Sequence, residues 1–212
     1  SKRIIRNDSS GSDPDDGKVI AMVEPDPGGR ERGELRRTTR SRLAEIPIEE
    51  RRLGSGSMSD LLPDVVGPIN VLGYLGDGVE VDIDPLIREL LAGGARVSVP
   101  AVRPEPGRMD AIRLTSLERS DLDTDRFGIR VPRRPWTTVD LDELDVILVP
   151  GVAFTERGDR LGRGGGYYDR LLAGAPDRTR RIGVCHRVQI VGTLPTRAHD
   201  VPMHAMKVLE SP

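Results

Sequence analysis

The sequence predicts a single three-layer α/β domain, with a mainly parallel sheet flanked by helices, behind a disordered N-terminal tail. Three observations support this prediction. From residue 30 onwards, short apolar runs alternate with helical patterns, which is typical of βα repeats. The 212 residues suit one domain with a sizeable core. Most of the first 29 residues are polar or turn-forming, so we expect a tail over 1–29 and the α/β domain over 30–212.

The tail prediction depends on composition. Residues 7–17 contain no apolar side chain, and residues 25–29 are proline and glycine around one aspartate. Residues 18–23 are apolar enough for a short strand or docking segment. Hydrophobic residues make up 36% of the chain and charged residues 31%, which indicates that part of the chain is not packed.

The helices and strands of the domain are predicted from apolar periodicity and from the residues that begin or end each element. A helical pattern begins at Glu31, and a second helix spans 85–91, with Asp84 as its cap and Pro85 in its first position. A third helix is expected over 167–173. The strongest strand is Val146–Val149, four apolar residues ended by Pro150. Other strands are expected over 69–75, 96–102, 109–115, 182–185 and 205–209.

Composition also excludes several classes of protein. The net charge of −2 argues against nucleic acid or an anionic membrane as the partner. Cys185 is the single cysteine, so an internal disulfide is excluded, and its apolar neighbours favour a buried strand position. No apolar run is long enough to span a membrane or to resemble a secretion signal. A monomeric cytoplasmic protein is the simplest expectation.

The loop after the strongest strand carries the chemistry. In parallel sheets, ligands bind beyond the carboxyl ends of strands, which places residues 150–166 at the expected site. Four glycines lie within five positions, Gly162 and Gly164–Gly166, directly before a helix. Glycine lets backbone N–H groups approach a ligand, and a helix N-terminus attracts anions. Arg160 and Arg163 add charge beside a phosphate, and Asp169 suits Mg²⁺ bridging to that phosphate.

Alternatives to a phosphate site remain at this point. A flexible glycine loop with a capping aspartate has the same local pattern. A Walker A loop is excluded because Gly-Lys-Ser/Thr is absent, and a dinucleotide fingerprint is excluded because Tyr167 stands where its third glycine belongs. The arginines of residues 30–42 form either a solvated helix face or a cluster aimed at a polyphosphate.

Two motifs together resemble the signature of 5-formyltetrahydrofolate cyclo-ligases: residues 150–154 (Pro-Gly-Val-Ala-Phe) and residues 160–169 (Arg-Leu-Gly-Arg-Gly-Gly-Gly-Tyr-Tyr-Asp). Shorter segments match the same family in the same order, and the resemblance extends from about residue 32 to residue 200. These segments are 32–36, 80–82 with 85–87, 127–129 and 199–203.

The resemblance implies a ligase that uses ATP to convert 5-formyltetrahydrofolate, a reduced folate, into 5,10-methenyltetrahydrofolate, releasing ADP and phosphate. It implies that Leu75 and Glu80 bind the folate and that Asp169 and Asp200 bind Mg²⁺. Arg163 and Tyr168 are the catalytic candidates. The expected ATP-binding residues are Arg32, Arg36, Arg160, Leu161, Gly162, Arg163, Gly164, Gly165, Gly166, Tyr167 and Tyr168.

The sequence departs from the family pattern at Arg32, Ile83, Val131, Arg197 and His204, where lysine, threonine, glutamate, glutamate and aspartate are usual. Aromatic residues make up 3% of the chain, which is few for a pterin pocket. The nucleotide half therefore matches better than the folate half. Two alternatives follow: a diverged enzyme that activates another formyl or amide compound with ATP, and a catalytically silent nucleotide- or folate-binding protein.

Overall fold

The computed structural model describes residues 28–53 and 69–210. The tail expected over 1–29 lies almost entirely outside the described residues, as does the docking segment expected over 18–23, so both stay predictions. Within the part of the chain that is described, no helix is long and apolar enough to cross a membrane.

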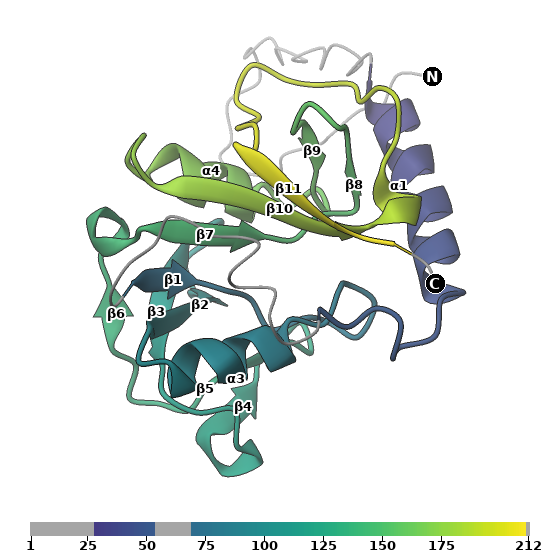
Figure 1. The fold of residues 1–212 in the computed structure, drawn as a ribbon. Coiled ribbons are helices and arrows are strands. Elements are labelled where there is room, and N and C mark those ends of the chain that lie inside the picture. Colours follow the sequence, from purple (N-terminus) through teal and green to yellow (C-terminus); the bar gives the residue numbers. More distant parts are fainter. Residues whose placement is uncertain (1–27, 54–68, 211–212) are drawn as a thin grey trace, which may run out of the picture.

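A seven-stranded sheet forms the centre of the molecule, in the order β11-β10-β7-β1-β2-β3-β6 (Figure 1). Four of its six strand pairings are parallel, and the two that include β3 are antiparallel. The prediction of a mainly parallel sheet is confirmed. The strands are β1 (Asn70–Leu72), β2 (Arg96–Val102), β3 (Met109–Leu114), β6 (Thr138–Val139), β7 (Val146–Val149), β10 (Arg180–His186) and β11 (Ala205–Leu209).

Helices cover both faces of this sheet, which gives the three layers. All four residues of β7 are buried, and alternate side chains belong to opposite cores. Val146 and Leu148 share one core with α3 (Asp84–Ala92). Ile147 and Val149 share the other core with α4 (Tyr167–Ala173). This burial on both faces explains why β7 reads as a continuous apolar run.

Helix α1 (Gly29–Ala44) lies to one side of the sheet, where it contacts strand β8 (Ala153–Phe154) and the short 3-10 helix η3 (Arg187–Gln189). Two antiparallel ribbons stand apart from the sheet: β4 (Leu122–Thr124) with β5 (Arg130–Pro132), and β8 (Ala153–Phe154) with β9 (Arg160–Leu161). The other 3-10 helices of the described residues are η1 (Arg119–Asp121) and η2 (Leu141–Glu143).

The sequence-based prediction differs from the structure at a few points. Asp84 is the first residue of α3 rather than its cap, which is Ile83 without a capping side chain. The Asp84 carboxylate instead pairs with Arg130 of β5 through two hydrogen bonds of 2.7 and 2.9 Å. The first strand is shorter than the predicted 69–75, because residues after Leu72 leave the sheet toward the site.

Candidate active site

A cavity of about 350 Å³ lies beyond the carboxyl ends of β1, β2 and β7. Its floor contains the residues that follow these strands, including Tyr74 and Leu75 after β1 and Pro150 and Gly151 after β7. This is the position expected for the ligand of a parallel α/β sheet.

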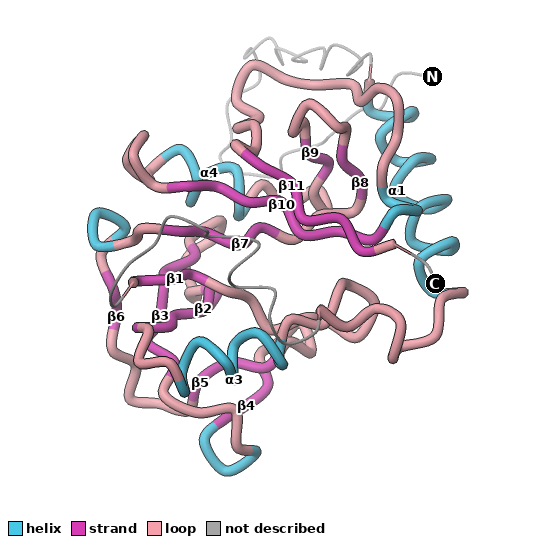
Figure 2. The backbone as a smooth tube through the Cα atoms, viewed as in Figure 1, coloured by secondary structure: helices cyan, strands magenta, loops and turns pink. Residues whose placement is uncertain are grey.

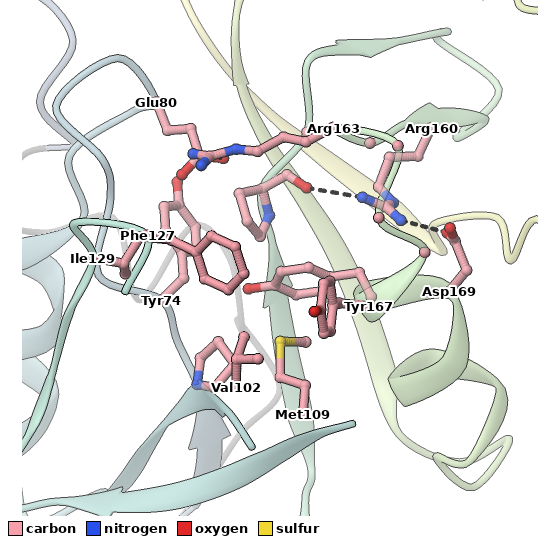
Figure 3. Close-up of a pocket in the computed structure, with 18 of the residues that line it drawn as sticks. Tyr74, Glu80, Val102, Met109, Phe127, Ile129, Arg160, Arg163, Tyr167 and Asp169 are labelled. Atoms are coloured by element: carbon pink, nitrogen blue, oxygen red, sulfur yellow. Dashed lines mark hydrogen bonds and ion pairs between the residues drawn. The ribbon is translucent and has the colours of Figure 1, made fainter. Parts of the chain in front are cut away.

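The cavity has two chemically different ends. One end is lined by Arg32 and Arg36 from α1, by Arg160 and Arg163, and by the glycine loop 162–166. The other end is lined by apolar side chains. Figure 3 shows Val102, Met109, Phe127 and Ile129 among these side chains. The cavity therefore suits a ligand that is anionic at one end and flat and apolar at the other.

Arg163 joins the two ends by contacting two carboxylates on the loop after β1. Its Nη2 lies 2.7 Å from Asp77 Oδ2 and 2.8 Å from Glu80 Oε1 (Figure 3 shows the contact with Glu80). Burial raises the pKa of Glu80, although the charge of Arg163 opposes the rise. Burial also acts to raise the pKa of Asp77. The backbone N–H groups of Val79 and Glu80, with Arg163, outweigh that effect and hold it below its usual value. Both carboxylates are largely buried, whereas a glutamate or aspartate without a motif would be expected at the exposed surface.

Arg160 lies almost fully buried beneath the arginine- and glycine-lined end of the cavity. Its Nη2 lies 2.5 Å from Asp169 Oδ1, and its Nη1 donates to the carbonyl of Pro150 at 3.3 Å (Figure 3). Its guanidinium also faces the Tyr168 ring, 5.5 Å from the ring centre. Burial raises the pKa of Tyr168, so its hydroxyl keeps its proton. That hydroxyl is buried and has no hydrogen-bond partner among the described residues.

The arginines of α1 divide between two environments. Arg32 is 6% exposed, and its Nη1 lies 3.4 Å from Asp200 Oδ2 and 3.1 Å from the Pro195 carbonyl. Arg36 donates from Nε to the Gly162 carbonyl at 2.8 Å, so it is tied to the glycine loop. Arg37 and Arg42 are exposed. Part of the helix is therefore a solvated face, and part points toward the cavity.

The glycine loop needs its glycines for a conformational reason. Gly164 and Gly166 have φ angles of +103° and +65°, which other residues rarely adopt. Arg170 of α4 holds the loop in place. Its Nη2 donates to the Gly165 carbonyl and its Nε to the Gly107 carbonyl, both at 2.8 Å. The loop is therefore shaped before any ligand arrives.

The few aromatic residues of this chain are concentrated at the cavity. The sequence has three tyrosines, two phenylalanines and one tryptophan. All three tyrosines and Phe127 line the cavity. Phe127 is 53% exposed, and its ring meets Tyr167 edge-on at 6.3 Å. The low aromatic content therefore does not leave the apolar end without flat partners.

Most residues singled out from the sequence come together here. Leu75 and Glu80 line the cavity together with the arginines, the glycines and both tyrosines of the motif. Leu161 does not line it, because its side chain is buried in the core and 1% exposed. Asp169 lines the main cavity, whereas Asp200 lines a smaller cavity beside it with Arg160 and Arg197.

Several residues of the site carry no signal strong enough to find them in the sequence. Tyr74, Val102 and Met109, which line the cavity, and Asp77, which pairs with Arg163 beside it, are common residue types without a motif, and the fold alone brings them to the site. Phe127 does have a signal in the sequence, since it begins the segment 127–129 (Phe-Gly-Ile), one of the short segments that match the family. The predicted buried position of Cys185 is confirmed, and burial raises the pKa of its thiol to about 12.

Fold and cavity together are those of an α/β enzyme, with an arginine- and glycine-rich loop beside an apolar, aromatic pocket. Comparison with known proteins gives the family. Residues 30–208 match the sequence profile of the 5-formyltetrahydrofolate cyclo-ligase family, and the chain belongs to this family.

Individual relatives agree with this assignment. The chain is 34% identical over 170 residues to the 5-formyltetrahydrofolate cyclo-ligase of Escherichia coli K12, covering 78% of this chain and 92% of the relative. It is 36% identical over 140 residues to the Mycolicibacterium smegmatis enzyme of the same name, covering 63% and 70%.

Two solved structures resemble the fold. The NMR structure of Aquifex aeolicus 5,10-methenyltetrahydrofolate synthetase has a TM-score of 0.67 and 31% identity, covering 84% of this chain and 89% of that one. The Mycoplasma pneumoniae 5,10-methenyltetrahydrofolate synthetase has a TM-score of 0.63 at 19% identity, covering 83% and 97%, and shows likeness of fold alone.

Proposed function

We propose that this chain converts 5-formyltetrahydrofolate into 5,10-methenyltetrahydrofolate with ATP, releasing ADP and phosphate. Family membership supports the proposal. The observation that carries it is a single cavity in which an arginine- and glycine-lined end adjoins an apolar, aromatic end, with Arg163 and Glu80 in contact between them. This arrangement holds a polyphosphate and a pterin side by side.

The proposed reaction has two steps. The formyl oxygen attacks the terminal phosphorus of ATP, and the bond to ADP breaks. Nitrogen 10 of the folate then attacks the formyl carbon and loses its proton, and phosphate leaves with the former formyl oxygen. Both steps depend on positioning and on stabilising charge at the phosphoryl group.

The proposed roles follow the geometry. Arg36 and the backbone N–H groups of the glycine loop hold the phosphates, and Arg163 stabilises the charge on the transferred group. Tyr168 keeps its proton and can donate a hydrogen bond to an oxygen of that group. The Glu80 carboxylate accepts hydrogen bonds from the polar edge of the pterin.

Asp169 fits a magnesium site shared with the phosphates. One of its oxygens is held by Arg160, and the described residues form no group of three or more His, Cys, Asp or Glu side chains. Mg²⁺ is often held by one or two carboxylates, substrate phosphates and water, so such a group is not required. When bound, the ion would neutralise phosphate charge. Asp200 anchors Arg32 in this structure, and its role as a metal ligand stays a prediction.

The test is a spectroscopic assay with purified protein, 5-formyltetrahydrofolate, ATP and Mg²⁺, following the near-ultraviolet absorbance of the methenyl product. We expect an ATP-dependent rise at enzymatic rates. ATP binding by calorimetry without a rise would refute the proposed substrate and favour a diverged substrate or a silent binder. A monomeric state and a cytoplasmic location are proposed alongside, and gel filtration tests the first.

A further inference from the structure

The segment that follows α1 runs beside the loop that follows β1 (Figure 2). The backbone N–H of Asp82 donates to the Arg51 carbonyl at 2.7 Å, and that of Leu53 donates to the Asp82 carbonyl at 2.9 Å. These bonds form a short parallel bridge between Arg52 and Asp82. The bridge brings residue 51 next to the loop that carries Asp77 and Glu80.

The Arg51 side chain turns inward onto this loop. It is 8% exposed, and its Nη1 donates to the carbonyls of Gly78 and Val79, both at 2.8 Å. A buried guanidinium is costly unless it is hydrogen-bonded, and its buried Nε has no partner among the described residues, so the two bonds from Nη1 are the ones that tie Arg51 to the loop. The two carbonyls belong to the residues directly before Glu80.

Asp77 is also paired with Arg40 at 3.5 Å, and Asp77 and Glu80 with Arg163, whereas the other bonds that shape the loop are short-range. The Asp77 carboxylate accepts from the N–H groups of Val79 and Glu80 at 2.9 and 3.1 Å. The Tyr74 hydroxyl donates to the Val81 carbonyl at 2.9 Å. Gly78 at the bend has a φ of +82° and open space where a Cβ would stand. These bonds within the loop determine its conformation, but its position relative to Arg163 depends on contacts with residues outside the loop.

We propose that Arg51 is a positioning residue for the folate half of the site. Through the carbonyls of Gly78 and Val79 it holds the loop so that Glu80 meets both the pterin and Arg163. The inference rests on the proposed function, because it assigns Arg51 to the binding of that substrate. Arg51 itself lies outside the cavity lining, so its proposed action passes through the loop.

The experiment compares Arg51→Met with Arg52→Met in the full chain. Both substitutions keep an unbranched side chain and remove one guanidinium from the same segment. Arg52 is the matched control, because its side chain is 59% exposed and pairs with the Asp82 carboxylate rather than with the loop carbonyls. The readouts are KM and kcat for each substrate, and calorimetric binding of ATP and 5-formyltetrahydrofolate.

We expect Arg51→Met to raise KM and Kd for 5-formyltetrahydrofolate about tenfold or more, as the loss of one buried charged anchor implies. ATP affinity should stay within about twofold of wild type, which also shows that the variant is folded. Arg51→Lys keeps the positive charge but not the forked guanidinium. Its KM for the folate should lie between those of wild type and Arg51→Met, and its KM for ATP should stay near that of wild type. Arg52→Met should leave both constants unchanged.

Three results would overturn the inference. Equal losses of ATP and folate affinity would assign Arg51 to general stability, and so would loss of ATP binding in both Arg51 variants. Unchanged folate constants in Arg51→Met would show that the loop keeps its place without this anchor. Wild-type protein that neither binds nor converts 5-formyltetrahydrofolate would instead refute the proposed function, so the two failures are distinguishable.

Discussion

Replacing Asp169 with asparagine should reduce both stability and turnover, because this carboxylate neutralises a buried arginine. The side chain of Arg160 is 4% exposed and that of Asp169 is 21% exposed, with 2.5 Å between Nη2 and Oδ1. Hydrogen bonds to charged groups contribute about 1.5–3 kcal/mol, and breaking a buried ion pair costs about 3–5 kcal/mol. Asparagine keeps one acceptor and the pair is partly solvated, so we expect a loss of about 2–3 kcal/mol.

Thermal denaturation followed by circular dichroism measures this loss. For a domain of this size, about 1 kcal/mol corresponds to about 2–4 °C, so Tm should fall by about 4–12 °C. Asp123→Asn is the matched control, because Asp123 and Arg133 are 50% and 57% exposed, and such a pair contributes at most about 1 kcal/mol. In the absorbance assay, the Asp169 variant should lose about a hundredfold or more in turnover.

The two readouts test separate claims. Equal Tm changes for the Asp169 and Asp123 variants would refute the buried ion pair. A normal Tm with lost turnover in Asp169→Asn would support a chemical role for Asp169 and refute its role in stability. A double-mutant cycle with Arg160→Met gives the coupling free energy directly, and a coupling near zero would show that the two side chains act independently.

Three further predictions concern Glu80 and Arg163 at the cavity and a glycine outside it. Below neutral pH, KM for the folate should rise as Glu80 takes up a proton, because a protonated carboxyl accepts fewer hydrogen bonds. The rise should begin at higher pH than for an ordinary glutamate, since burial raises the pKa of Glu80, and Glu80→Gln should abolish this pH dependence. Because Arg163 joins the two ends of the cavity, we expect ATP and the folate to strengthen each other's binding in paired calorimetric titrations, and Arg163→Lys to weaken this coupling; unchanged coupling would contradict this role. Gly158→Ala should lower stability by about 2 kcal/mol or more, because φ is +92° and a Cβ would lie 2.5 Å from the Met203 carbonyl oxygen, whereas Gly192→Ala, with open space, should melt like wild type.

The elements that could be predicted from the sequence are those whose signal is local. The strand Val146–Val149 has the predicted bounds because its run of apolar residues is buried on both faces. The helix Tyr167–Ala173 follows a glycine in a left-handed conformation, which is the break that the glycine run predicts. The ribbon strands β8 and β9 have two residues each, too short for any period to be visible.

Site residues could be predicted from the sequence where they belong to a motif. They could not be predicted where their burial depends on residues that are distant in the sequence. Arg160 has a residue type that is usually exposed, and its burial follows from Asp169, Pro150 and Tyr168, which meet it in space. Asp77 has no motif, yet it shares Arg163 with Glu80. Arg51 illustrates the same limit, since two backbone carbonyls as partners leave no trace in the sequence.

The placement of the aromatic rings divides the spectroscopic signals of this protein. Trp136 lies away from the cavity, where its indole N–H donates to the Pro132 carbonyl at 2.6 Å and its ring is flanked by the guanidinium groups of Arg103 and Arg134. Tryptophan emission therefore reports on whether the β5 end of the molecule is folded. The three tyrosines all line the cavity, so we expect their near-ultraviolet circular dichroism to respond to ligand binding. One sample can thus be followed for unfolding and for occupancy at the same time, without a label.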